Sequence, residues 1–160
     1  MEWVAKIFGI STGVKDSAEA ADLKRELANR ENELGPDHPD ITPCLNNLAE
    51  LYKSHGRYAL AEPLYQRALE IRENALGPDH PSVAQSLKHL AMLCRARRRY
   101  AESESFFKRS LAIKEKALGP DHPSVATSLE NIAKLYRKMG REDEAEQLAQ
   151  RAAAIRTMKW

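Results

Sequence analysis

The chain has 160 residues, 42% of them hydrophobic, and its 25 basic and 23 acidic residues leave a formal net charge of only +2. A chain of this length and apolar content can bury one ordinary core, which argues against a disordered protein. A charge so close to zero gives no global reason to expect a nucleic-acid or membrane partner.

The N-terminal segment, MEWVAKIFGI, is apolar but short. It lacks a small-residue cleavage site, and no apolar run in the sequence approaches the roughly 20 residues that span a bilayer, so we predict neither a secretory signal nor a membrane helix. We predict a shortened helix over residues 3–10, with Trp3, Ile7 and Ile10 facing inward, and a second helix over residues 17–34. The alternative is that the apolar segment is unrelated to the pattern that follows it.

The next two predicted helices flank Gly56. Apolar residues recur every three or four positions on both sides of it, which is the period of one helical face. These residues are Leu45, Leu48, Ala49 and Tyr52 before the glycine, and Ala61, Leu64, Tyr65, Ala68 and Leu69 after it. We therefore predict helices over residues 39–54 and 58–75, joined by a short turn.

The hexapeptide LGPDHP begins at residues 34, 76 and 118, that is, every 42 residues. A fixed period of this length indicates a repeat architecture, and a composition rich in Ala, Leu, Glu, Lys and Arg favours helices over the strands of a propeller. In each copy we expect the leucine to pack the last turn of a helix and the glycine to end that helix. The aspartate is then expected to cap the next helix, whose first turn holds the second proline. The hexapeptide is therefore predicted to be a structural junction between pairs of helices.

A metal site is the alternative interpretation of these copies, built from His38, His80 and His122. Equivalent residues of stacked helices lie at least about 8–10 Å apart, whereas each zinc ligand atom lies about 2 Å from the metal. We therefore expect no metal and no other cofactor. The two cysteines, Cys44 and Cys94, fall inside helical patterns, which suggests a reducing compartment and a cytoplasmic protein.

The stretch LNNLAELYKSHGRYALAEPLYQRALEI resembles a tetratricopeptide repeat, with Leu-Ala, Tyr, Gly, Ala, an aromatic residue and Ala-Leu in the order typical of that family. The usual period is about 34 residues, and the longer period with its LGPDHP junction resembles the kinesin-light-chain type. Arg98 departs from the pattern, because Gly56 and Gly140 mark the equivalent turns. Ala149 also departs, standing where Tyr65 is aromatic.

This resemblance implies an all-α fold, an α-solenoid of antiparallel helix pairs in a right-handed superhelix. It implies one repeat domain over residues 1–160, with a degenerate first unit (1–40), two full repeats (41–82 and 83–124) and a final repeat (125–160).

The resemblance also implies a protein or peptide partner, because in this family the first helix of each pair lines a concave groove. Asn47 and Asn131 match asparagines that contact the peptide backbone in kinesin-light-chain-type repeats, while His89 replaces the middle one. The candidate peptide-binding residues are Asn46, Asn47, Lys53, Lys88, His89, Met92, Arg95, Asn131, Lys134 and Arg137. Residues 83–101 contain no acid but five basic residues, and cations favour carboxylates. We therefore expect an acidic peptide; the alternative is an ordinary solvated helix face.

Two other functions stay open. The stretch RARRR, Arg95 to Arg99, could bind nucleic acid if stacking aromatic residues were interleaved with its charges. The chain carries no obvious polar capping helix, so the terminal helices could also pair with a second copy. The candidate self-association residues are Trp3, Ile7, Ile155 and Trp160. No phosphate-binding glycine loop, metal-ligand motif or nucleophile–base pair indicates an enzyme or a small-molecule substrate.

Overall fold

The computed structural model describes residues 16–158, which form seven α-helices, one 3-10 turn and no strand. The helices are α2 (Ala18–Leu34), α3 (Thr42–Ser54), α4 (Tyr58–Leu76), α5 (Pro81–Ala96), α6 (Tyr100–Leu118), α7 (Pro123–Lys138) and α8 (Glu142–Thr157), and the 3-10 turn η1 (Pro39–Ile41) directly precedes α3. The all-α fold class is confirmed, and the helices predicted around Gly56 are present as α3 and α4. The helix predicted over residues 3–10 lies outside the described residues.

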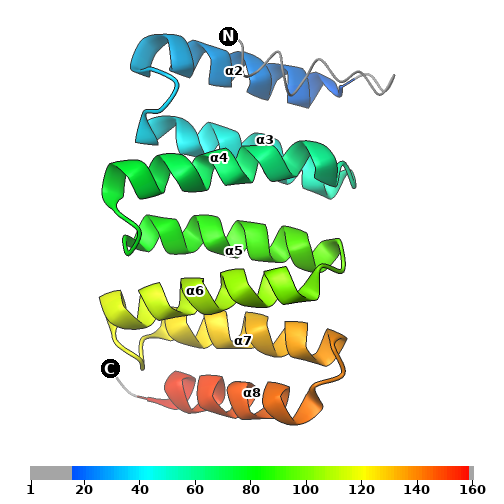
Figure 1. Cartoon of the computed structure of the whole chain (residues 1–160), viewed down its shortest axis with the longest axis vertical. Coiled ribbons are helices and arrows are strands. Elements are labelled where there is room, and N and C mark those ends of the chain that lie inside the picture. The colour runs from blue at the N-terminus through cyan, green and yellow to red at the C-terminus, as the bar shows by residue number, and fades with distance from the viewer. Residues whose placement is uncertain (1–15, 159–160) are drawn as a thin grey trace. The chain divides into compact units, whose positions relative to one another are not determined.

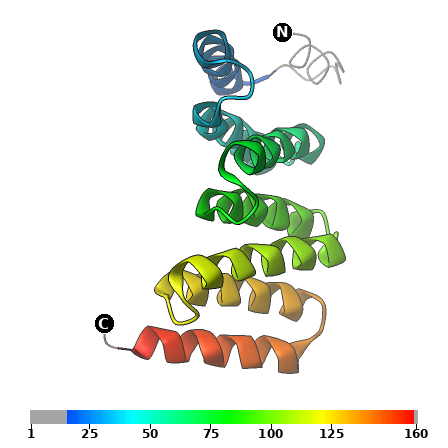
Figure 2. The same cartoon turned by 60° about the vertical axis from the view of Figure 1, so that its left-hand side comes forward.

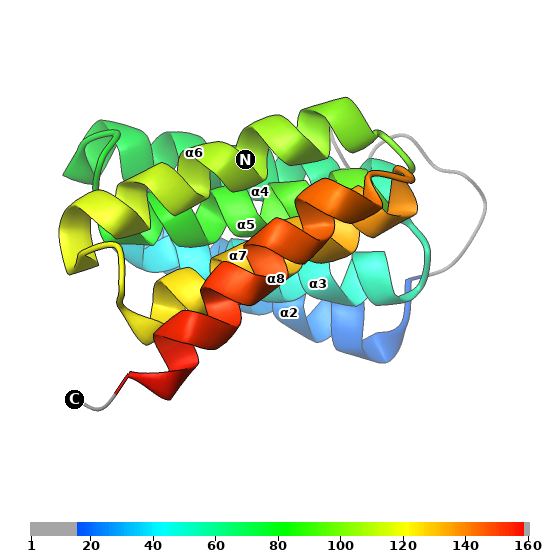
Figure 3. The same ribbon diagram turned by 90° about the horizontal axis from the view of Figure 1, so that it is seen from below.

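The helices fall into two compact units, one ending at Ala75 and one beginning at Leu76. The first unit holds α2, η1, α3 and nearly all of α4, and the second holds α5 to α8 (Figure 1, Figure 2). Within the second unit consecutive helices run antiparallel, and α6 packs against both α5 and α7. The last helix, α8, packs on α7 and runs obliquely across it when seen from below (Figure 3). The pairs α5–α6 and α7–α8 are therefore helical hairpins.

A glycine ends the helix before each junction, as predicted. Gly35 and Gly119 have φ angles of 97° and 90°, in the left-handed region that side chains with a Cβ rarely adopt. The N–H of each glycine donates a 2.9 Å hydrogen bond to the carbonyl oxygen four residues earlier, in Glu31 and Glu115. These bonds close the last helical turn and turn the chain toward the next helix.

The helix after each junction is capped by histidine, so the prediction of an aspartate cap is wrong. The Nδ1 atom of His122 accepts a hydrogen bond from the N–H of Ser124 at 3.1 Å. The same bond, again at 3.1 Å, joins His38 to Asp40 and His80 to Ser82. The aspartates that were expected to cap, Asp37, Asp79 and Asp121, are exposed. The physical reason is register: Pro123 occupies the first helical position, so the residue directly before it is the cap and the aspartate lies one residue too early.

The leucine of each hexapeptide does not pack the last helical turn, which corrects a second expectation. Leu34 and Leu118 are 39% and 44% exposed, because the chain turns away at the glycine that follows. The junction is held by polar bonds instead. Arg67 of α4 donates to the carboxylate of Glu31 at 2.6 Å and to the carbonyl oxygen of Pro36 at 2.5 Å. In the second unit the equivalent bonds run from Arg151 to Glu115 (2.6 Å) and Pro120 (3.3 Å).

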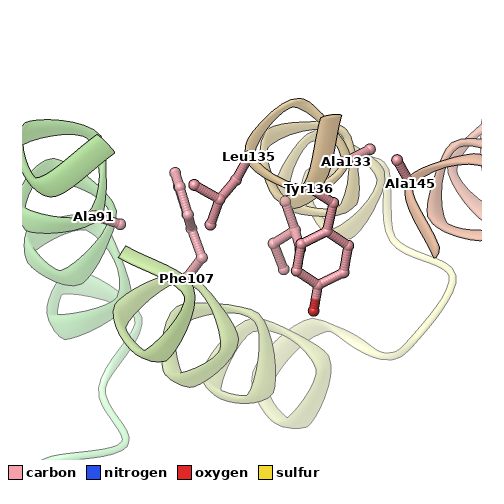
Figure 4. Close-up of a cluster of buried hydrophobic side chains, with 7 residues drawn as sticks. Ala91, Phe107, Ala133, Leu135, Tyr136 and Ala145 are labelled. Carbon is pink, nitrogen blue, oxygen red and sulfur yellow. The ribbon is translucent and has the colours of Figure 1, made fainter. Parts of the chain in front are cut away.

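The core of the second unit combines large and small side chains. Phe107 of α6 projects between Ala91 of α5 and Leu135 of α7, and Ala133 and Ala145 face each other between α7 and α8 (Figure 4). Phe107 is only 2% exposed and Ala145 is fully buried. Alanines where two helices meet let their backbones approach, and the aromatic ring fills the space beside them.

A tyrosine cluster fixes the turn of the α7–α8 hairpin. The Tyr136 hydroxyl donates to Glu104 at 2.8 Å, Arg141 donates to the second oxygen of Glu104 at 3.0 Å, and the Arg141 guanidinium lies 3.9 Å from the centre of the Tyr136 ring. Burial tends to raise the pKa of Glu104, but hydrogen bonds from Lys108 and Tyr136 and the charges of Lys108 and Arg141 outweigh it, so the pKa is lowered. The first unit repeats this arrangement with Tyr52, Asp16 and Arg57.

The turn inside the α5–α6 hairpin has no glycine. Gly56 and Gly140 have φ angles of 71° and 75° at the equivalent turns, and Arg98 holds the same conformation with a φ of 59°. The Arg98 side chain is exposed. A residue with a Cβ is strained in this conformation, so this turn carries a backbone strain that the other two avoid.

Candidate functional site

The three candidate residues of the first unit lie on α3 and have different surroundings. Asn47 is exposed, whereas Asn46 is 9% exposed and its Oδ1 atom has no hydrogen-bond partner among the described residues. Lys53 pairs with Glu50 at 2.8 Å, and Glu50 also accepts a 2.7 Å hydrogen bond from the Tyr65 hydroxyl. The charge of Lys53 is therefore balanced within its own unit, which makes it a weaker candidate for a ligand carboxylate.

On α5 the four candidate residues form one half-buried stripe. Lys88, His89, Met92 and Arg95 follow one another at helical spacing, and none is fully exposed. Met92 packs against the core cluster that contains Phe107. The Nη1 atom of Arg95 is buried and has no hydrogen-bond partner within residues 16–158. No acidic residue occurs in α5.

On α7 the candidate residues occupy the equivalent stripe. Asn131 is half-buried, and Lys134 and Arg137 are exposed. The Nε atom of Arg137 lies 4.0 Å from the carboxylate of Glu142, at the limit of an ion pair. The buried residues of α7 pack in clusters with residues of α5, α6 and α8. None of the three candidate residues is among the buried residues of α7.

We call the surface formed by these two stripes the α5–α7 face; its residues are Lys88, His89, Met92, Arg95, Asn131, Lys134 and Arg137. The single acid of α7, Glu130, pairs with Arg156 of α8 at 2.8 and 2.9 Å, and this hydrogen bonding lowers the pKa of Glu130. Among the described residues Lys88, Arg95 and Lys134 have no ion pair. The α5–α7 face is therefore positively charged and suited to carboxylates.

The structure adds Lys114, a residue that the sequence analysis did not select. It is half-buried on α6, and its Nζ atom donates to the Oγ atom of the buried Ser128 on α7 at 3.1 Å. Burial lowers the pKa of Lys114, and the charge of Lys88 lowers it further. The repeat period could have revealed it, because the positions 42 residues apart, Arg30, Arg72, Lys114 and Arg156, are all basic.

The aromatic residues beside the RARRR stretch are used in packing. Phe107 is buried, and Tyr100 and Phe106 pack against the same core cluster. Arg99 pairs with Glu102. Packing therefore buries the ring of Phe107 and partly covers the rings of Tyr100 and Phe106.

The candidate self-association residues are only partly described. Ile155 is 1% exposed and packs on α7 with Val125, Ala126 and Leu129. Its side chain is therefore not available to a second copy. The other three, Trp3, Ile7 and Trp160, lie outside the described residues.

Neither a metal centre nor a membrane helix is present in the part of the chain that the structure describes. Within residues 16–158 no group of three or more His, Cys, Asp or Glu side chains is placed to hold a metal ion. None of the described helices is both long enough and apolar enough to cross a membrane. Cys44 and Cys94 are both buried, and neither forms a disulfide within the described residues.

Two family models match the chain and together cover all of the described residues. The model described as tetratricopeptide repeat matches residues 16–74, and the model described as the nephrocystin-3 TPR domain matches residues 63–159. The chain belongs to the tetratricopeptide repeat family. The fold of this family is that of a scaffold for protein–protein interactions, and the resemblance stated from the sequence is confirmed.

Solved structures specify the type of this tetratricopeptide repeat protein. BtubC (BKLC) from P. vanneervenii is 27% identical with a TM-score of 0.76, and the match covers 87% of this chain and 56% of that one. A putative kinesin light chain from Podosopora anserina, with nearly identical TPR-like repeats, is 27% identical with a TM-score of 0.75, over 88% of this chain and 67% of that one. MamA MSR-1, at 22% identity and a TM-score of 0.56 over 86% of this chain and 65% of that one, shares the fold. No curated protein matches the chain.

The repeats are therefore of the kinesin-light-chain type. The chain spans little more than half of the BtubC structure and two thirds of the kinesin light chain structure.

Proposed function

We propose that this tetratricopeptide repeat protein binds an acidic segment of a partner protein on its α5–α7 face. The binding would be that of an adaptor: the partner segment is held in place and no covalent chemistry follows. The repeat family supports a protein partner, and the charge and composition of the α5–α7 face support the class of segment.

The charge of the α5–α7 face is the observation that carries the proposal. α5 has no acid, and the one acid of α7, Glu130, is already paired with Arg156. Lys88 and Lys134 form no ion pair within residues 16–158. Carboxylates on a bound segment would supply the missing negative charge through charge-assisted hydrogen bonds.

The remaining side chains suit a peptide in an extended or short helical conformation. The side-chain amide of Asn131 can both donate to and accept from a peptide backbone. Met92 offers a flexible apolar surface beside the cations, suited to an aromatic or aliphatic anchor residue. An acidic segment that also carries an apolar residue would therefore be preferred over a purely acidic one.

The strength of binding follows from the exposure of the cations. Exposed ion pairs contribute only about 0–1 kcal/mol each, and salt screens them further. Affinity should therefore be modest, should fall as the salt concentration rises, and should depend on the apolar anchor at Met92.

The test reverses two charges on the face and compares the peptides that bind. In the double variant Lys134→Glu, Arg137→Glu, selection from a random library of 12-residue peptides should no longer enrich acidic sequences. The melting temperature should stay nearly unchanged, because both side chains are exposed and the ion pair of Arg137 with Glu142 is long, at 4.0 Å.

A matched control reverses two cations elsewhere. Arg25 and Lys116 are each 72% exposed and each pairs with an exposed aspartate. The double variant Arg25→Glu, Lys116→Glu changes the net charge by the same amount and should select the same peptides as the parent. If the variant at Lys134 and Arg137 also selects the parent's peptides, the α5–α7 face is not the binding surface.

A further inference from the structure

Lys114 occupies an unusual electrostatic position in the second unit. Its side chain extends from α6 to α7, where Nζ bonds the hydroxyl of Ser128 at 3.1 Å. The Ser128 hydroxyl in turn donates to the carbonyl oxygen of Ser124 at 3.3 Å. Lys88 of α5 is close enough for its charge to act on Lys114. The ammonium group of Lys114 and the hydroxyl of Ser128 therefore meet between α6 and α7, and the charge of Lys88 on α5 acts on this position.

No carboxylate of the described chain balances these two ammonium groups. The other two lysines in the middle and last turns of α6 are paired: Lys108 with Glu104 at 2.6 Å and Lys116 with Asp79 at 2.6 Å. Both of them are exposed, whereas Lys114 is half-buried. Placing an unpaired charge in a partly buried position next to a like charge is unfavourable, so the arrangement lacks an anion.

In the α7–α8 hairpin the position equivalent to Lys114 is paired with an acidic residue of the same hairpin. Arg156 is the equivalent of Lys114, one period of 42 residues later, and Glu130 is the equivalent of Lys88. In the α7–α8 hairpin Arg156 and Glu130 form a 2.8 Å ion pair. In the α5–α6 hairpin Lys88 replaces the acid of this pair, so two cations occupy the positions that hold a cation and an acid in the next repeat.

We propose that Lys88, Lys114 and Ser128 form a subsite that binds the carboxylate of one Asp or Glu side chain of the bound peptide. The inference rests on the proposed function and makes it more specific, because it assigns one acid of the segment to one place. It differs from general attraction by exposed lysines, since Lys114 belongs to the second helix of its hairpin and is partly shielded from solvent. A carboxylate there can accept from both ammonium groups at once.

Removing the charge of Lys114 should leave the stability of the protein equal or higher but should weaken the binding of an acidic peptide. The variant Lys114→Met removes a half-buried charge and its repulsion with Lys88, so the melting temperature should be equal to or higher than that of the parent. Binding of an acidic peptide should weaken about 10-fold, which corresponds to about 1.4 kcal/mol. The control Lys116→Met, on the same helix but 72% exposed, should change affinity by no more than about 2-fold, as expected for an exposed ion pair.

A double-mutant cycle identifies the acid. The probe is the tightest peptide that the parent selects from the 12-residue library, together with variants in which each acid is replaced in turn by its amide. One replacement should cost the parent about 10-fold in affinity and should cost the Lys114→Met variant nearly nothing, while the other replacements affect both proteins equally. The variant Lys88→Glu, which rebuilds the arrangement of the last hairpin, should be more stable than the parent and should lose the preference for that same acid.

The outcomes separate the subsite from the proposed function. If every acid replacement weakens the parent and Lys114→Met by the same factor, the subsite is wrong while peptide binding on the α5–α7 face stands. If the parent selects no peptide, or if its peptides still bind the Lys134→Glu, Arg137→Glu variant, the proposed function is wrong and the subsite falls with it.

Discussion

Replacing Arg98 by glycine should stabilise the protein, because the backbone there favours a residue without a Cβ. The φ angle of Arg98 is 59°, whereas the equivalent turns use Gly56 at 71° and Gly140 at 75°. Its side chain is exposed and makes no hydrogen bond or ion pair among the described residues, so the substitution removes no contact. The left-handed conformation costs a residue with a Cβ about 1–2 kcal/mol, and the greater freedom of glycine in the unfolded chain offsets about 0.5–1 kcal/mol of that gain. We expect a net stabilisation of about 0.5–1 kcal/mol.

The assay is urea denaturation followed by circular dichroism, with Arg98→Ala as the matched control. Alanine removes the same charge and side chain but keeps the Cβ, so Arg98→Ala should leave the unfolding free energy unchanged within about 0.5 kcal/mol. Arg98→Asn should lie between the two, because asparagine tolerates the left-handed region. If Arg98→Ala stabilises the protein as much as Arg98→Gly does, the cost at this turn comes from repulsion among neighbouring arginines and not from the backbone, and the reasoning is refuted.

Two further predictions test the junctions and the tyrosine cluster. His122→Ala should lower the free energy of unfolding by about 1 kcal/mol because it removes a helix cap, whereas His122→Asn should preserve most of it because asparagine is a good cap; a urea series that gives both variants the same stability would contradict the cap. The folded-state pKa of Glu104 is lowered, so its contribution to stability is complete above the unfolded-state pKa and is lost as the pH falls through the folded-state value. Melting temperatures between about pH 3 and pH 7 should therefore fall less steeply for Glu104→Gln than for the parent, and equal slopes would show that Glu104 does not contribute.

The limits of the helix pairs could be predicted from the sequence because three independent signals agree at each LGPDHP junction. Apolar spacing defines the helices, glycine marks where the backbone turns to a positive φ, and proline marks the first turn of the next helix. Gly119 and Pro123 illustrate this, since their backbone roles depend only on their own covalent structure.

The capping residue could also have been predicted, but from a different signal. Asp121 and His122 are both polar, and side-chain preference alone favours aspartate. Because Pro123 occupies the first helical position, the residue before it must be the cap. The position relative to the proline therefore determines which residue caps the helix, and the capping preference of the side chain does not.

The contacts between helices could not be predicted from local patterns, because they join residues far apart in the sequence. The bond from Arg67 to Pro36 spans 31 residues, and the one from Lys114 to Ser128 spans 14. The local sequence around these residues carries no pattern that would indicate either bond. The candidate residues on α5 and α7 were selected through the family resemblance. That Lys53 forms an ion pair and Lys88 does not could not be predicted in this way, because it depends on which carboxylates lie nearby in the folded chain.

The central claim is that an acidic segment binds the α5–α7 face, and the crystal structure of the chain with its tightest library-selected peptide tests it most directly. The account predicts a peptide along α5 and α7, with one carboxylate between Lys88 and Lys114 and another beside Lys134. A peptide bound instead along the outer sides of α6 and α8, or at either end of the chain, would contradict it.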